Sequence, residues 1–289
     1  CVEPLSELPD VNVIVVDNAS SDGSVDAILD LELTVIRRAE NGGFAAGCNE
    51  GWRAGTAPFV LFLNPDTLLP NTAPLEACVA AMTSPSGSAI GICGVQLVDE
   101  RGAVAKTSTR FPTPRRVFGW IFGLDRALPG IFEPQFVVEN DHRSDATVDV
   151  VMGAFFFVRR SVFDLLEGFD ERFFVYYEEV DFCRRALGKG FTTRFLSGAS
   201  VIHKGHGTTD SIRAKRYFLV TRSRILYGLA HFPAPVALLL GMLTIVAEPL
   251  IRVAFFGVSG NFRAVAETLS GAAMVLREAP RYLLSTRRA

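Results

Sequence analysis

The chain has 289 residues, 49% hydrophobic and 21% charged, which supplies a sizeable core and excludes an intrinsically disordered protein. Twenty-nine basic and 31 acidic residues leave a net charge of −2, which argues against a protein that binds nucleic acid over its whole surface. The five cysteines form no CxxC pair, so we interpret them as buried apolar residues in a reducing compartment.

The first residue is Cys1, and residues 1–10 resemble the end of a helix that runs into a turn. We therefore expect that further residues precede Cys1 in the natural protein. A valine-rich run at 11–16 predicts a strand buried on both faces. Turn and N-cap residues follow it at 17–24, then a helical stretch at 24–31 and a strand at 33–36.

The next apolar run, 59–63, predicts another buried strand, which ends in Asn64-Pro65-Asp66. A helix at 72–82 and a strand at 91–98 come after it. Because strands alternate with helices, these elements predict an α/β sheet with right-handed crossovers.

Residues 106–149 contain four prolines and show no regular periodicity, so we expect a long irregular excursion over the binding face. Periodic segments then return. They predict strands at 150–158, 191–195 and 199–202 and helices at 161–166 and 178–187.

The segment from 211 to the end differs in composition from the rest of the chain. It carries eleven basic and three acidic residues, a charge of +8, which leaves −10 for the remainder. Residues 212–231 have a helical pattern, and 236–256 are strongly apolar but interrupted by Glu248-Pro249 and Arg252. Because a spanning helix needs about 20 uninterrupted apolar residues, we favour a helix or hairpin lying in the membrane interface. A helix buried against the body, or a dimer face, is the alternative.

Two acids follow predicted strands directly: Asp17 and Asp66. Open α/β sheets bind ligands where the loops at the strand ends converge, and two acids there could hold a divalent cation and a nucleotide. Acids in such positions are as often only helix N-caps.

A glycine-rich loop, Asn41–Gly51, leads into a helix. Backbone without Cβ atoms can approach a phosphate or sugar closely, and a helix N-terminus favours negative charge. The loop is neither a P-loop nor a GxGxxG motif, and close helix–strand packing is the simpler interpretation.

Three carboxylates, Glu178, Glu179 and Asp181, stand at the start of a predicted helix. Repulsion between like charges raises the proton affinity of at least one, which suits a general base. Acids also favour the first turn of any helix, so this pattern alone decides nothing. His203 ends a predicted strand; it could be a metal ligand, although a lone histidine is more often structural.

Taken in order over about residues 11–207, these segments resemble the family 2 glycosyltransferases of GT-A fold, especially their bacterial rhamnosyltransferase-like branch. The motifs that carry the resemblance are VIVVDNASSDGS, NGGFAAGCNEG, FLNPDT, GAFFFVRRSVFDLLEGFDERFFVYYEEVDFCRR and VIHKGHGTT. FLNPDT resembles the branch's version of the DxD metal motif, with Asn64 in place of the first acid. The strand and helix with which the family usually begins are absent from this sequence.

The resemblance implies an α/β fold with a GT-A type, Rossmann-like, mostly parallel sheet flanked by helices. We expect a glycosyltransferase domain at 1–210, with its nucleotide-binding part at about 1–100 and its acceptor and catalytic part at about 101–210. Residues 211–289 then form a basic, apolar helical extension beside the membrane.

The resemblance also assigns roles. Glu179 occupies the position of the family's catalytic base, where the family has Asp, and Glu178 and Asp181 are the competitors. Asp66 and His203 are the implied ligands of Mn²⁺ or Mg²⁺. The implied nucleotide-sugar-binding residues are Asp17, Asn18, Ser20, Asn41, Gly43, Asn49, Asn64 and Asp66.

The resemblance thus implies inverting transfer of a sugar from a nucleoside diphosphate donor, dTDP-rhamnose, to a cell-envelope glycan or lipid-linked saccharide. We expect an enzyme in the cytoplasm, peripheral to the inner face of the bacterial membrane, with no nucleic-acid partner. A nucleotidyltransferase, and a non-catalytic module of the same fold that binds nucleotide sugars or glycans, are the alternatives.

Overall fold

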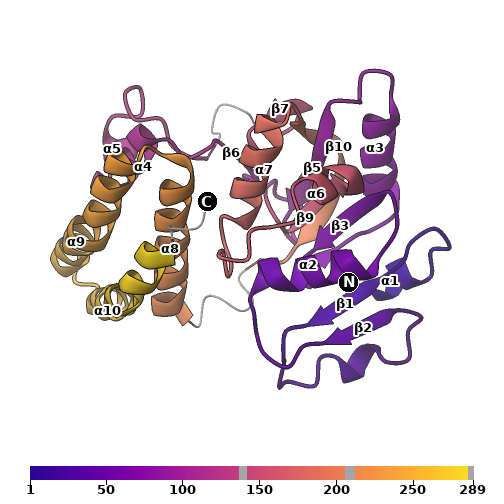
Figure 1. Ribbon diagram of the computed structural model, residues 1–289, viewed down its shortest axis with the longest axis horizontal. Coiled ribbons are helices and arrows are strands. Elements are labelled where there is room, and N and C mark those ends of the chain that lie inside the picture. The colour runs from indigo at the N-terminus through magenta and orange to yellow at the C-terminus, as the bar shows by residue number, and fades with distance from the viewer. Residues whose placement is uncertain (137–141, 206–211, 286–289) are drawn as a thin grey trace. The chain divides into compact units, whose positions relative to one another are not determined.

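The structure is a computed structural model that describes residues 1–136, 142–205 and 212–285, with side chains as far as residue 281. The chain forms two compact units (Figure 1). Unit 1 comprises residues 1–111, 136–174 and 178–205. Unit 2 comprises residues 112–135, 175–177 and the chain from 206 onward.

A six-stranded mixed sheet forms the centre of unit 1. Its strand order is β3-β9-β5-β10-β4, and β7 also pairs with β10. The bounds are β3 Phe59–Leu63, β4 Thr67–Leu68, β5 Ile90–Val98, β7 Ala146–Val148, β9 Phe155–Arg159 and β10 Thr192–His203.

The α/β class is confirmed, but the sheet is mixed where we expected a mostly parallel one. Only β5 and β10 pair in parallel within it; β9 runs antiparallel to both β3 and β5. The reason is the long excursion after β5, which returns the chain between β5 and β3 in the opposite direction. A strand–helix alternation read along the sequence does not reveal such an insertion.

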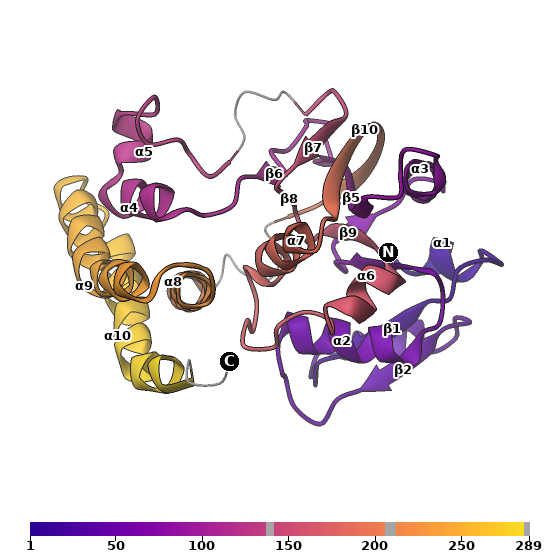
Figure 2. The same ribbon diagram turned by 45° about the horizontal axis from the view of Figure 1, so that its top comes forward.

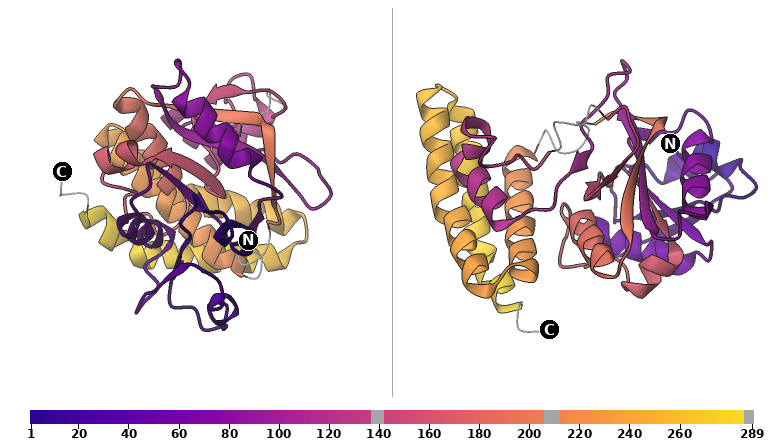
Figure 3. Two further views of the ribbon diagram at one scale, coloured as in Figure 1. Left: turned by 90° about the vertical axis from the view of Figure 1, so that its right-hand side faces the viewer. Right: turned by 90° about the horizontal axis from the view of Figure 1, so that it is seen from above.

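Successive side chains of a strand point to opposite faces of the sheet. Because both faces of this sheet carry apolar side chains, helices cover both of them. On one face, Cys93, Val95 and Leu97 of β5 form a buried cluster with Cys78 and Met82 of α3 (Ala73–Thr83). Figure 3 shows the sheet nearly edge-on.

The other face is aromatic. Phe156 of β9 meets Phe182 of α7 (Glu178–Gly188), and Phe182 stacks on Phe163 of α6 (Arg160–Leu165). Phe156, Phe163 and Phe182 are fully buried. Each large apolar side chain buried in this way stabilises the fold by about 1.5–3 kcal/mol. This cluster fixes α7 on the sheet.

The N-terminal strands form a sheet of their own. β1 (Ile14–Asp17) and β2 (Thr34–Arg37) pair in parallel, and α2 (Phe44–Ala54) packs on β1. β1 is only half-buried, so our expectation of a strand buried on both faces is wrong, because in the described chain it pairs with β2 alone. The short α1 (Glu3–Ser6) precedes β1, and the helix expected at 24–31 is a single 3₁₀ turn, η1, Asp26–Ile28.

The excursion at 106–149 is more regular than we expected. β6 (Ser108–Thr109) pairs with β8 (Val150–Val151), and two helices lie between them, α4 (Pro114–Phe122) and α5 (Leu124–Ala127). The strand expected at 150–158 is therefore two strands, β8 and β9. The two strands expected at 191–202 are one, β10, with an irregular register between Leu196 and Ser200.

Unit 2 is a helical bundle of α8 (Arg213–His231), α9 (Ala234–Val258) and α10 (Phe262–Ser285), which run side by side in Figure 2. Val117 and Ile121 of α4 pack on Leu240 of α9. The structure thus groups residues 112–135 with the C-terminal helices, whereas we expected them in the catalytic part; the domain boundary after residue 210 stays a prediction.

α9 continues through Glu248 and Pro249, the residues that interrupt its apolar sequence. Glu248 faces the bundle and forms a buried ion pair with Arg224 of α8, so its charge does not meet an apolar environment unpaired. By length and composition, α9 is the one helix of the described chain that could cross a membrane. Its outward side chains Leu238, Leu239, Met242, Val246, Leu250 and Phe255 are each more than half exposed.

Candidate active site

Asp17 ends β1 and is buried at the start of the following turn. Its Oδ1 accepts a hydrogen bond from the backbone N–H of Ser20 at 2.9 Å. Hydrogen bonds from Ser20 hold the pKa of Asp17 below its ordinary value, so the carboxylate stays charged. A charged acceptor fixed in this way can recognise an N–H group of a ligand.

Asn18 connects this turn to the glycine-rich loop. Its Nδ2 donates to the carbonyl oxygen of Gly43 at 3.1 Å, while its Oδ1 is buried and accepts no hydrogen bond from the described residues. A buried acceptor without a donor is uncommon in native structures and marks a place where a ligand or water belongs.

Gly43 is the N-cap of α2 and has φ +91°, a conformation that favours glycine. Asn41 Oδ1 accepts from its N–H at 3.0 Å, and a Cβ atom on Gly43 would lie 2.2 Å from the carbonyl oxygen of Phe174. The glycine therefore permits a close approach between the start of α2 and the segment that leads into α7. The N–H of Phe44 completes the contact by donating to Phe174 O at 2.6 Å.

The three predicted carboxylates of α7 have three different environments. Glu178 is 4% exposed, and its Oε2 makes no hydrogen bond within the described residues. Burial raises the pKa of Glu178 well above its ordinary value, and the charge of Glu179 raises it further. Glu179 is only half-buried. One of its carboxylate oxygens, Oε2, is nevertheless buried.

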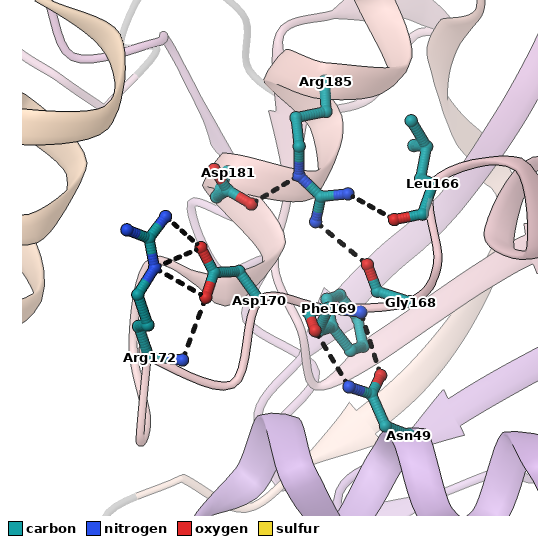
Figure 4. A network of polar contacts seen from close by, with 8 residues as sticks. All are labelled: Asn49, Leu166, Gly168, Phe169, Asp170, Arg172, Asp181 and Arg185. Atoms are coloured by element: carbon teal, nitrogen blue, oxygen red, sulfur yellow. Dashed lines mark hydrogen bonds and ion pairs between the residues drawn. The ribbon is translucent and has the colours of Figure 1, made fainter. Parts of the chain in front are cut away.

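Asp181 belongs to a supporting network instead (Figure 4). Its Oδ2 accepts from Arg185 Nε at 2.7 Å, and the other guanidinium nitrogens of Arg185 donate to the carbonyl oxygens of Leu166 and Gly168 at 2.9 and 3.0 Å. Asp181 thus fixes the guanidinium group of Arg185, and Arg185 in turn stabilises the turn at residues 166–168. This ion pair at positions i and i+4 was legible in the sequence, but we assigned Arg185 no role.

Asn49 is the second part of this network. Its Nδ2 donates to Phe169 O and Glu171 Oε1, and its Oδ1 accepts from Phe169 N, at 2.8–2.9 Å. The side chain is 1% exposed. Because this amide is engaged within the protein, Asn49 holds the 169–171 segment to α2, and it has no part in the donor binding we propose below.

Asp66 and His203 come together as expected. β4 follows Asp66 and pairs with the end of β10, which places His203 opposite Thr67. His203 Nε2 lies 3.3 Å from Asp66 Oδ1. This Oδ1 is buried and accepts no hydrogen bond from the described residues. Asn64 lies just before, where its N–H donates to Ala154 O at 3.1 Å.

The predicted site residues thus lie in two groups within unit 1. In the first group, hydrogen bonds link the Asp17 turn to the start of α2, and the start of α2 to Phe174. The second group consists of Asp66, Asn64 and His203. The described residues contain no group of three His, Cys, Asp or Glu side chains that could hold a metal ion, so this part of the chain brings only Asp66 and His203 together as possible ligands. A cavity of about 100 Å³ elsewhere in unit 1, lined by Phe111, Asp149 and Cys183 among others, contains none of the predicted residues. Residues 206–209 of the last motif lie outside the described residues.

The sequence profile described as "Glycosyl transferase family 2" matches residues 1–166. The chain belongs to this family.

Relatives of this family 2 glycosyltransferase include N-acetylglucosaminyl-diphospho-decaprenol L-rhamnosyltransferase of Mycobacterium tuberculosis. It is 29% identical over 219 residues, which cover 68% of each chain. Rhamnosyltransferase WbbL of Escherichia coli is 25% identical over 170 residues, covering 58% of this chain and 60% of that one.

Among solved structures, the mannosyltransferase PcManGT from Pyrobaculum calidifontis in complex with GDP-Man and Mn²⁺ is similar with a TM-score of 0.50. The two chains are 20% identical over 96% of this chain and 76% of the other. This similarity confirms the GT-A fold of the family 2 glycosyltransferase.

Proposed function

We propose that the protein transfers a sugar, with inversion, from a nucleoside diphosphate donor to a hydroxyl group of its acceptor. The observation that carries the mechanism is the Glu178–Glu179 pair at the start of α7. We propose that Glu178, whose pKa is raised by burial, is the protonated member of the pair and that Glu179, which is less buried, carries the negative charge. Among the three competing acids we therefore assign the role of general base to Glu179.

In the proposed reaction, Glu179 removes the proton of the acceptor hydroxyl. The acceptor oxygen forms a bond to the anomeric carbon from the face opposite the diphosphate. The bond from that carbon to the diphosphate oxygen breaks, and the electron pair leaves with the nucleotide. Attack from the opposite face inverts the configuration of the anomeric carbon.

The donor-binding roles follow from the Asp17 turn. Asp17 is a charged acceptor for an N–H group of the base, and Asn18 offers the buried Oδ1 that the described residues leave without a donor. Gly43 allows the start of α2 to come close to a ligand, and N–H groups at a helix start favour phosphate oxygens. Ser20 and Asn41 hold Asp17 and Gly43 in place.

A divalent cation fits beside Asp66 and His203. The described residues give the buried Asp66 Oδ1 no hydrogen bond, and an imidazole nitrogen lies 3.3 Å from it, so a carboxylate and an imidazole converge. This donor set suits Mn²⁺ better than Mg²⁺. When bound, the ion would neutralise negative charge on the leaving diphosphate. Asn64 carries an amide in place of a carboxylate, so oxygen atoms of the diphosphate and of water would complete the coordination.

We propose dTDP-rhamnose as the donor and a lipid-linked saccharide or envelope glycan as the acceptor. Two relatives are rhamnosyltransferases by name, and the name of one specifies a diphospho-decaprenol acceptor. The outward face of α9 supports a lipid-linked acceptor, because its exposed leucine, valine, methionine and phenylalanine side chains suit a lipid surface. The enzyme would then work in the cytoplasm, at the inner face of the membrane.

The decisive experiment measures thermal stabilisation by a panel of nucleotide sugars with and without Mn²⁺, followed by product analysis with a decaprenyl-linked saccharide. We expect dTDP-rhamnose to stabilise the protein most. We also expect the anomeric configuration of the new linkage to be opposite to that of the donor sugar. Retained configuration would refute inversion. Release of pyrophosphate would identify a nucleotidyltransferase, and donor binding with neither hydrolysis nor transfer would identify a non-catalytic module.

A further inference from the structure

Three residues lie between Phe174, which contacts the start of α2, and the proposed catalytic helix: Val175, Tyr176 and Tyr177, which we call the strap. They belong to unit 2, whereas Phe174 before them and Glu178 after them belong to unit 1. The chain therefore leaves unit 1 after Phe174 and returns to it at the first of the two paired glutamates.

The backbone of the strap is strained. Tyr176 and Tyr177 have φ values of +67° and +71°, the left-handed region that bulky side chains rarely adopt. Two consecutive aromatic residues keep this conformation only if their surroundings enforce it. The contacts that enforce it act on the residues that directly precede α7 in the chain.

Helix α8 supplies these contacts. Ser223 Oγ, which is fully buried, donates a hydrogen bond to the carbonyl oxygen of Val175 at 2.9 Å. The ring of Tyr227, which is 1% exposed, lies 5.7 Å from the ring of Tyr177. His231 and Phe232 pack on Tyr227 in turn, so its ring has little freedom.

The strap is also held at its other end. Phe44 N donates to Phe174 O, immediately before Val175. Glu178 follows Tyr177 directly in the chain, so the backbone conformation of the strap sets how the chain enters the first turn of α7. A small displacement here moves the carboxylate of Glu179 relative to a bound acceptor, and about 1 Å of misplacement can cost a hundredfold in rate.

We infer that Ser223 and Tyr227 of α8 are positioning residues for the proposed catalytic base. This inference predicts an effect on kcat, which rests on the proposed function of Glu179, and an effect on the structure of α7, which does not. It assigns the helical unit a part in catalysis besides any contact with a membrane: α8 maintains the strained strap, and the strap fixes the first turn of α7.

Four variants of the full chain test the inference. Tyr227→Leu removes the ring that packs on Tyr177, Tyr227→Phe retains it, and Ser223→Ala removes the hydrogen bond to Val175. Leu240→Ala is the control, because it removes a buried side chain of unit 2 that packs with Val117 and Ile121 of α4.

For Tyr227→Leu and Ser223→Ala we expect kcat, per folded molecule, to fall about tenfold or more while the donor KM stays within about twofold. Tyr227→Phe should restore most of kcat. Leu240→Ala should lower the melting temperature without lowering kcat per folded molecule. A purely structural role would change melting temperature alone in all four variants, and that result would overturn the inference.

Hydrogen exchange supplies a readout that needs no enzymatic activity. In Tyr227→Leu, amides 178–182 should exchange about tenfold faster, while those of β5 keep their rates. Leu240→Ala should leave amides 178–182 unchanged. If the wild-type protein transfers no sugar, the proposed function fails, but exchange at α7 still decides this inference; unchanged exchange in Tyr227→Leu would refute it.

Discussion

Asp66 Oδ1 and His203 Nε2 lie 3.3 Å apart at the junction of β4 and β10, although one residue belongs to the first quarter of the chain and the other to its last third. Antiparallel pairing of His203 with Thr67 brings them together. Asp66 Oδ1 is buried, and the described residues give it no hydrogen-bond donor. This is the place at which metal dependence is most directly tested.

Asp66→Ala should weaken nucleotide binding in the presence of Mn²⁺ by at least tenfold, because the only carboxylate of the proposed cation site is lost. Isothermal titration with dTDP, with and without Mn²⁺, measures the effect. Glu100→Ala, the loss of an exposed acid of the same unit, is the control. An unchanged Mn²⁺ dependence in Asp66→Ala would remove the residue from the site.

Glu179→Gln should lower kcat by a factor of about 10²–10⁴, because the amide cannot accept the acceptor's proton, while nucleotide binding stays within about twofold. Glu178→Gln should keep most of the activity, since that carboxyl group is proposed to be neutral already. Steady-state kinetics of the pair decide between them. Full turnover by Glu179→Gln would transfer the role to another acid.

The stability of the protein should fall with rising pH through Glu178. Its pKa is raised on folding above the ordinary 4.5, so its contribution is complete below that value and is lost as the pH rises toward the folded pKa. Glu178→Gln has no carboxyl group at this position, so its free energy of unfolding should not show this decrease. Urea unfolding at a series of pH values should show that the stability of the variant relative to the wild type increases as the pH rises above about 4.5.

Glu7→Gln, at an exposed position of the surface, is the control for this measurement because it also removes one carboxylate. A stability difference between Glu178→Gln and wild type that does not vary with pH would show that burial of Glu178 has no thermodynamic cost.

Arg185→Ala should destabilise the protein by about 2–4 kcal/mol, because it leaves Asp181 buried without its ion pair and removes the donors of Leu166 O and Gly168 O. Arg172→Ala breaks the more exposed pair with Asp170 and should cost less than about 1 kcal/mol. Urea denaturation compares the two. Equal effects would mean that the network of Figure 4 adds no stability.

Met242, Val246 and Leu250 lie about one helical turn apart on the outward face of α9 and are 59–65% exposed. Replacing all three by Gln should reduce sedimentation with phosphatidylglycerol vesicles at least tenfold, because apolar area is lost from the lipid contact. Leu29→Gln, an equally exposed leucine of unit 1, should bind as the wild type does. Vesicle binding by the triple variant at the wild-type level would refute the proposed membrane face.

Alkaline carbonate extraction then distinguishes the two membrane arrangements. Extraction of the wild-type protein indicates a helix that lies in the interface, as we propose. Resistance to extraction indicates that α9 spans the bilayer, which its uninterrupted length of 25 residues allows.

The sequence predicted those elements that are determined by neighbouring residues. The bounds of β3 match the apolar run at 59–63, because turn residues enclose a run of strand length. α7 begins at the residue where the acids of a first turn begin. α4 was missed although its signals are local: Thr113 caps it, Pro114 occupies the first turn, and Gly123 ends it in the left-handed conformation. The four prolines of the excursion led us to discount them.

What the sequence could not show depends on long-range pairing. Asn49 and Phe169 are 120 residues apart, and no periodicity reveals that the glycine-rich motif ends in a side chain engaged by the catalytic motif. The insertion of β9 between β3 and β5, and the grouping of the strap with α8, likewise arise from contacts that form only in the folded chain. The sequence indicated that the acids of α7 are candidates for catalysis. It did not show that Glu178 is buried, that Glu179 is less buried or that Asp181 is paired with Arg185.

The irregular stretch of β10 has an unexpected importance for this enzyme. Leu196 pairs with Val95 and Ser200 with Gln96, so Ser197, Gly198 and Ala199 are extra residues in one strand. Since successive side chains point to opposite sides, removing any one of these three would turn the imidazole near the strand's end away from its aspartate. This irregular stretch, which includes the buried Ala199, thereby sets the strand register on which the proposed cation site depends.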